Sequence, residues 1–232
     1  MRCAIMQPTY LPWAGYFNLA CSVDIFVFLD DVQFERRSWQ SRNRILMNGR
    51  PVYLTVPVKK NSQTALIGDI DVLENEDWRA AHWKTLCTSY SKAPGGIFVL
   101  DLLECHYKGP LIVKLADFNI SIFKSLIEVL GIDVKIIKAS QLLCNGKRAD
   151  HLYKIAKALD CDEYLSPVGS MSYLFADGFN LHEDIKLIFQ EFTPTPYKHY
   201  GCDHFLSSLS IVDVIANLGI EAASKYVRNF SD

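Results

Sequence analysis

Apolar residues along the chain fall into short runs, which are typical of strands, and longer periodic stretches, which are typical of helices. Arg2–Gln7 is a short run that stops at Pro8 and predicts a buried strand. Residues 25–29 form a continuous run of β-branched, aromatic and leucine side chains, which suits a strand covered on both faces. Residues 16–21 lie between them and predict a short helix. The chain therefore begins with a strand, a loop, a short helix and a second strand.

A β-hairpin is predicted next. Asn48-Gly49 separates two apolar stretches, residues 43–47 and 51–58. Both turn residues tolerate a positive φ, which a tight two-residue hairpin requires. The pattern at residues 65–72 favours a further strand.

The remainder of the chain alternates between helical and extended patterns. Helices are predicted at residues 77–91, 110–130, 148–159, 211–218 and 221–227, and strands at 134–138, 163–165 and 185–189. No repeat or linker divides the chain. The sequence therefore predicts a single α/β domain over residues 1–232, with a mostly parallel, Rossmann-like sheet, an early β-hairpin insertion and a helical middle.

Composition and charge narrow the classes of protein. The 232 residues are 50% hydrophobic and 12% aromatic, which excludes a disordered chain. A net charge of −2 argues against a nucleic-acid partner. No apolar run approaches the roughly 20 residues of a membrane helix, and the N-terminus lacks a signal-peptide cleavage site. The seven cysteines include no Cys-x-x-Cys pair, so we expect reduced thiols in a cytoplasmic protein without a metal or membrane contact.

The loop after the first strand is the first candidate binding segment. It contains Gln7, Tyr10, Trp13 and Gly15. Ligands of α/β sheets bind outside the carboxyl ends of the strands, and an amide, a ring hydroxyl, an indole and a close backbone approach suit a ring-bearing ligand. The alternative is a rigid structural turn whose aromatic residues belong to the core.

The segment after the second strand is the second candidate. Asp30 and Asp31 end the strand, and a polar stretch follows with Gln33, Arg36, Trp39, Arg42, Asn43 and Arg44. Arginine side chains bind phosphates in a bidentate manner, and several together suit a diphosphate. Paired carboxylates suit a proton transfer, a metal or sugar hydroxyls. The alternative is a solvated loop in which the charges pair with one another.

Two weaker candidates lie later in the chain. Ser166, Gly169 and Ser170 follow a predicted strand and suit an anion at a helix start, or simply a capping turn. His204 follows Asp203 in a loop, where such a pair suits a base and its orienting carboxylate.

The other histidines and the known motifs add little to these candidates. His82, His106, His151 and His182 stand alone, and we expect surface or capping roles for them. The motifs GxxxxGK[ST], GxGxxG, GxSxG and HExxH are absent, which argues against the P-loop, dinucleotide-binding, hydrolase and zincin classes.

Several of these segments together closely resemble the WbqC-like family. The resemblance covers residues 7–17, 26–34, 36, 39–45, 55–58, 90–94, 164–169 and 209–213, and so spans nearly the whole chain. The sequence departs from the family pattern at Ser41, where asparagine is usual, and at Gly95-Gly96, where an aromatic pair is common.

The resemblance implies a role in bacterial O-antigen (lipopolysaccharide) or related surface-polysaccharide biosynthesis, since some members are described as transferring glycine or another acyl unit to an amino sugar. We therefore expect a transferase that joins an acyl or aminoacyl donor to a nucleotide-linked amino sugar. Asp30 or Asp31 would deprotonate the ammonium, and Arg36, Arg42 and Arg44 would hold the diphosphate. No cofactor is assigned, and a homo-oligomer is compatible with the sequence.

Other readings stay open. The same residues suit a nucleotide-sugar-binding protein without turnover, or a partner of a glycosyltransferase. An ATP-dependent amide ligase ranks below these, because the histidines of adenylate-forming nucleotidyltransferases are missing. RNA binding through residues 36–44 is weakened by the neighbouring acidic side chains Asp30, Asp31 and Glu35.

Overall fold

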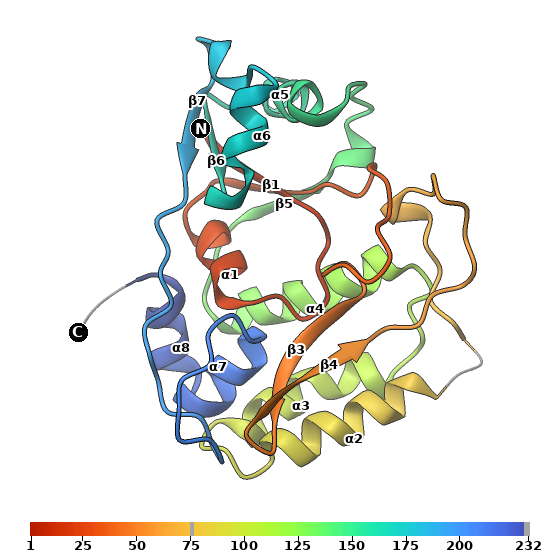
Figure 1. The fold of residues 1–232 in the computed structure, drawn as a ribbon, viewed down its shortest axis with the longest axis vertical. Coiled ribbons are helices and arrows are strands. Elements are labelled where there is room, and N and C mark those ends of the chain that lie inside the picture. The colour runs from red at the N-terminus through yellow and green to blue at the C-terminus, as the bar shows by residue number, and fades with distance from the viewer. Residues whose placement is uncertain (75–76, 230–232) are drawn as a thin grey trace.

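A five-stranded parallel sheet with the strand order β5-β2-β1-β6-β7 lies in the upper part of the molecule as drawn in Figure 1. The computed structural model describes residues 1–74 and 77–229. The strands are β1 (Arg2–Met6), β2 (Ile25–Phe28), β5 (Lys135–Lys138), β6 (Glu163–Ser166) and β7 (Lys186–Phe189). Every pair of neighbours in this sheet is parallel. The predicted α/β class, parallel sheet and order of the first elements are confirmed.

Helices cover both faces of the sheet (Figure 1). Alternate residues of a strand point to opposite faces, so Ile25 and Val27 pack under α5 and α6, whereas Phe26 and Phe28 pack on the other side with α1 and α4. The helices are α1 (Ala14–Cys21), α2 (Trp78–Tyr90), α3 (Gly96–Lys108), α4 (Leu115–Val129), α5 (Arg148–Ala158), α6 (Met171–Ala176), α7 (Ile211–Leu218) and α8 (Ile220–Val227). The continuous apolar run at residues 25–29 is typical of a strand whose sheet is covered by helices on both faces.

The early hairpin forms a separate two-stranded sheet, β3 (Arg42–Met47) and β4 (Arg50–Thr55), as predicted. Asn48 and Gly49 both have positive φ, 52° and 73°, which makes the tight turn possible. The hairpin packs against α2 and α7, so part of the hydrophobic core lies away from the parallel sheet.

Two predictions about elements are wrong, and one helix was not predicted. Residues 65–72 form no strand: the segment holds a 3-10 turn at Ile67–Asp69, because Ile67 and Ile70 both reach the core from it. The helix predicted from Pro110 begins only at Leu115. The helix α3 lies where no helix was predicted, whereas α6 begins directly after Ser170, in the segment that was predicted to suit a helix start.

The order of the strands creates a crevice at the carboxyl edge of the sheet. From β1 the chain adds β2 and β5 on one side, and then β6 and β7 on the other. The loops that follow β1 and β6 therefore leave in different directions, which is the geometry at which α/β proteins bind ligands. No helix in the described part of the chain has the length and apolarity to cross a membrane.

Candidate functional site

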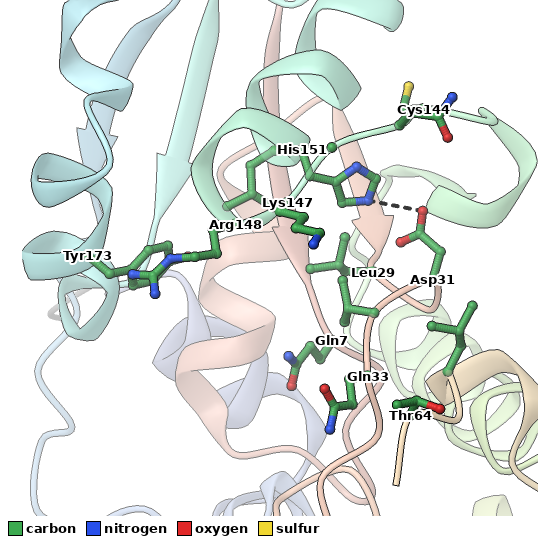
Figure 2. A pocket seen from close by; sticks show the side chains of 15 residues that line it. Gln7, Leu29, Asp31, Gln33, Thr64, Cys144, Lys147, Arg148, His151 and Tyr173 are labelled. Atoms are coloured by element: carbon green, nitrogen blue, oxygen red, sulfur yellow. Dashed lines mark hydrogen bonds and ion pairs between the residues drawn. The ribbon is translucent and has the colours of Figure 1, made fainter. Parts of the chain in front are cut away.

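The largest cavity, about 1060 Å³, lies at this carboxyl edge (Figure 2). Its walls come from the loops after β1 and β2, the segment between β5 and α5, and the helices α5 and α6. The side chains that carry chemistry there are Gln7, Asp31, Gln33, Cys144, Lys147, Arg148, His151 and Tyr173. Of the residues predicted from the sequence, Gln7, Asp31 and Gln33 line this cavity.

Asp31 and His151 form a hydrogen-bonded pair in the wall of the cavity. His151 Nε2 lies 3.0 Å from Asp31 Oδ2, and His151 is only 5% exposed. An ionised carboxylate can only accept, so Nε2 carries the proton. Asp31 Oδ1 and His151 Nδ1 are both buried without a hydrogen-bond partner among the residues that the structure describes. An unpaired buried carboxylate oxygen in a cavity wall is a candidate for contact with a ligand.

Asp30 has a different environment from its neighbour. It is 3% exposed, and its carboxylate accepts hydrogen bonds from the backbone N–H and the hydroxyl of Ser140, at 2.9 and 2.7 Å. Its carbonyl accepts the N–H of Gly68 at 2.8 Å. The structure therefore places Asp30 in a link between the ends of β2 and β5, while Asp31 lines the cavity.

Positive charge enters the cavity from the start of α5. Lys147 is exposed and extends into the open space in front of Asp31 (Figure 2). Arg148 lies 6.0 Å from the ring centre of Tyr173, and its Nε donates to Asp177 at 2.6 Å. The first N–H groups of a helix add a partial positive charge to these two cations. This end of the cavity suits an anionic group.

Two smaller cavities continue the cleft along the edge of the sheet. One of about 310 Å³ shares Gln7, Leu29, Leu152 and Tyr173 with the largest cavity. The predicted residues Ser166 and Ser170 line it, with their hydroxyl oxygens 2.6 Å apart. The other, of about 300 Å³, is lined by Trp13 and shares Trp39 with the cavity of about 310 Å³. The three cavities are therefore neighbours, and each adjacent pair has lining side chains in common.

The predicted arginines lie on the hairpin and its preceding loop. Trp39 stacks on Tyr53 at 6.3 Å, the guanidinium of Arg42 lies 4.7 Å from the Tyr53 ring centre, and that of Arg44 lies 5.8 Å from Trp39. Arg36 is exposed on the loop. None of these arginines lines the largest cavity, so the structure separates them from Asp31 and His151.

Three residues of the predicted set are held by contacts within the protein. Tyr10 is fully buried, and its hydroxyl lies 2.9 Å from His82 Nδ1 and 2.5 Å from the Tyr107 hydroxyl. Asn43 donates to the carbonyls of Tyr10 and Leu11 and accepts from the N–H of Arg44. Gly15 lies directly against the indole of Trp13, where a Cβ would be 2.2 Å from the ring.

The last two predicted residues lie outside the three cavities. Gly169 is exposed, with open space around it. His204 lies in the loop before α7, with Nδ1 3.6 Å from Cys202 Sγ. The neighbouring His199 is buried and pairs with Asp213 at 2.7 Å.

Lys147, Arg148 and His151 line the largest cavity but were not among the site residues predicted from the sequence. His151 was expected at the surface or in a cap, yet it is buried against Asp31. The missed signal is the position of Lys147 and Arg148, which follow the strand β5 and open a helix just as ligand-binding segments of α/β sheets do. In the described part of the chain, no group of three or more His, Cys, Asp or Glu side chains could hold a metal ion.

The fold and the cavities define an α/β protein with a cleft at the switch point of a parallel sheet. The chain belongs to the WbqC-like protein family, which matches residues 7–225. It is 28% identical over 229 residues to an uncharacterized protein of Mycobacterium tuberculosis, and the matched region covers 98% of this chain and 97% of that relative. No solved structure matches it.

Proposed function

We propose that the protein is a transferase that forms an amide on an amino sugar linked to a nucleotide, in the assembly of a bacterial surface polysaccharide. The observation that carries the proposal is the unpaired, buried Oδ1 of Asp31 in the wall of the largest cavity. A carboxylate oxygen without a partner attracts an ammonium group, which is the form of an amino sugar near neutral pH.

Asp31 has the chemistry of a general base for this reaction. An amine attacks a carbonyl only after it loses its proton, so Oδ1 takes one proton from the ammonium. The neutral nitrogen then attacks the acyl carbon of the donor and forms the new C–N bond. The bond from that carbon to the leaving group breaks, and the leaving group departs with the electron pair and the second amine proton.

His151 acts on this step through Asp31. Its N–H holds Oδ2 at 3.0 Å, which fixes the plane of the carboxylate and leaves Oδ1 as the oxygen for the substrate. His151 is itself fixed by burial on α5. It is therefore a positioning residue, and Asp31 is the group that meets the substrate.

The cations at the start of α5 suit the acyl donor. Activated acyl donors usually carry phosphate groups, and Lys147 and Arg148 supply positive charge on the same cavity as Asp31. The donor and the amine would thus meet in front of Asp31. This arrangement needs no ATP, because the acyl group arrives activated.

The test is amide formation from purified protein, dTDP- or UDP-linked amino sugars and a glycyl or acetyl thioester, without ATP, with the product detected by mass. Asp31→Asn is expected to lower kcat by about 10²- to 10⁴-fold. Asp150→Asn is the matched control, because Asp150 is an exposed carboxylate on α5 that pairs with Lys154.

Each result decides a point. Full turnover by Asp31→Asn would remove the assignment of the base. Product that forms only with added ATP would favour a ligase. Wild-type protein that binds the amino sugar, loses this binding in Asp31→Asn and forms no product would instead be a nucleotide-sugar-binding protein.

A further inference from the structure

We infer that the cavity lined by Trp13 and Trp39 is the site for the nucleotide end of the substrate, with its phosphates at Arg44. The inference rests on the proposed function for the identity of the sugar, but it concerns a different part of the cleft. The ligand assigned to this cavity is a planar heterocycle that is linked to a phosphate group.

The lining of the cavity is suited to a flat ring. Two tryptophans, Trp13 and Trp39, and the ring of Tyr16 face a space of about 300 Å³. The Tyr16 hydroxyl donates to the Gln7 carbonyl at 2.7 Å, and the Asn43 side chain bonds the backbone, so these two polar groups are not free to bind a ligand. A ligand here is therefore held by stacking, with little hydrogen bonding to its edge.

Trp39 is held in place although it is 48% exposed. It stacks on Tyr53, and Tyr53 in turn lies under the guanidinium of Arg42. Strand pairing brings Tyr53 opposite Arg44, whose guanidinium lies against Trp39. The two rings and the guanidinium groups of Arg42 and Arg44 therefore form one cluster on the hairpin and the loop before it. A ring fixed in this way loses little side-chain entropy when a ligand binds beside it.

Arg44 supplies the charge for a phosphate. Its guanidinium lies 5.8 Å from the Trp39 ring centre, and its Nη2 donates to the carbonyl of Ser208, another residue of the cavity wall. Its Nε is buried without a hydrogen-bond partner in the part of the chain that the structure describes. No salt bridge involves Arg44 among the described residues, so its charge is available to an anion.

The direction of the substrate follows from the order of the cavities. The cavity of about 300 Å³ that Trp13 and Trp39 line has Trp39 in common with the cavity of about 310 Å³. The latter has Gln7 in common with the largest cavity, so it lies between the other two. A nucleotide at Trp39 therefore places the attached sugar toward Asp31. The opposite orientation would put the nucleotide at Lys147 and Arg148 instead.

Calorimetric titration with UDP, dTDP and the corresponding nucleosides tests the assignment. Trp39→Ala is expected to weaken binding of the diphosphates by about 10-fold or more, because base stacking is lost. Arg44→Gln is expected to weaken binding of the diphosphates but not of the nucleosides. Trp83→Leu is the matched control, because Trp83 also lies beside a cation, Lys108 at 5.2 Å, but lines none of the three cavities.

Asp31→Asn separates this inference from the proposed function. Its affinity for UDP and dTDP should equal that of the wild type, whether or not the wild type turns over. Wild-type affinity in Trp39→Ala would overturn the inference, as would the absence of any diphosphate binding at millimolar concentration. Loss of binding in Lys147→Ala, with Trp39→Ala unaffected, would reverse the orientation and also overturn it.

Discussion

Ser140 donates two hydrogen bonds to the carboxylate of Asp30, one from its backbone N–H at 2.9 Å and one from its hydroxyl at 2.7 Å. These bonds tie the end of β2 to the segment after β5, two neighbouring strands of the sheet. Because Asp30 is held on that side, the next residue, Asp31, faces the cleft beside α5. The link is therefore part of what positions the candidate base.

The Asp30–Ser140 link predicts a measurable and non-additive effect on stability. Ser140→Ala removes one charge-assisted hydrogen bond, with an expected loss of about 1.5 kcal/mol in the free energy of unfolding, and Asp30→Ala removes both, with a loss of about 3 kcal/mol. The double variant should be little less stable than Asp30→Ala alone, because the two residues share the interaction. Urea unfolding of the three variants measures this, and simple addition of the two losses would contradict it.

His151 is predicted to act on turnover and not on substrate affinity. His151→Ala leaves Asp31 Oδ2 without its donor, so the carboxylate is no longer held in one orientation, and misplacement on this scale costs about 10²-fold in kcat. His151→Gln keeps an N–H donor on α5 and should recover most of the rate. Steady-state kinetics in the amide assay separates kcat from KM. A rise in KM at constant kcat would show that His151 binds the substrate instead.

Local patterns predicted most elements of the fold correctly. Asn48-Gly49 marks a hairpin because few other residue pairs accept two positive φ values, and the run at residues 25–29 marks a strand because it is apolar on both faces. The segment at 65–72 was misread because a 3-10 turn can also bury Ile67 and Ile70. The helix α3 was missed because its start, Gly95-Gly96, looks like a loop in the sequence.

The candidate site was only partly predictable, because tertiary packing decides it. Asp30 and Asp31 are equivalent in the sequence, and only the position of Ser140 shows which of them is used internally. His151 lies 120 residues from Asp31, so no spacing rule connects them. The rule that ligands bind at the carboxyl ends of strands pointed to the edge of the sheet where the largest cavity lies, since Gln7 and Asp31 both line that cavity.

A second buried carboxylate predicts a large loss of stability on substitution. Asp213 is fully buried and accepts hydrogen bonds from the hydroxyls of Tyr90 and Tyr197 and from His199 Nδ1, at 3.1, 2.7 and 2.7 Å. His199 Nε2 accepts the N–H of Leu206, so His199 connects this carboxylate to the backbone of the loop before α7. Burial, and then the charge of Asp213, raises the pKa of Tyr197, which keeps the phenol a donor.

Asp213→Ala is expected to lower the free energy of unfolding by about 3–5 kcal/mol, because His199 and two tyrosines lose their acceptor inside the protein. Tyr197→Phe removes one donor and should cost about 1–2 kcal/mol. Urea unfolding compares the two variants. A loss below 1 kcal/mol in Asp213→Ala would mean that the network contributes nothing to the fold.

The stability of the protein is predicted to fall in mild acid because of His82. Burial lowers the pKa of this residue to about 4, and its Nδ1 lies 2.9 Å from the hydroxyl of Tyr10. The unfolded chain takes up this proton near pH 6.5, whereas the folded protein does so only near pH 4. Between these values the unfolded state binds more protons, so each pH unit of acidification lowers the free energy of unfolding by about 1.4 kcal/mol through this residue.

The variant His82→Gln tests this prediction, because glutamine keeps an acceptor for Tyr10 but cannot titrate. Urea unfolding at several pH values should therefore show a smaller slope for His82→Gln between pH 6.5 and 4. His106, whose pKa burial also lowers, is present in both proteins, so its contribution cancels in the comparison. Equal slopes would mean that His82 is protonated in the folded protein as readily as in the unfolded chain.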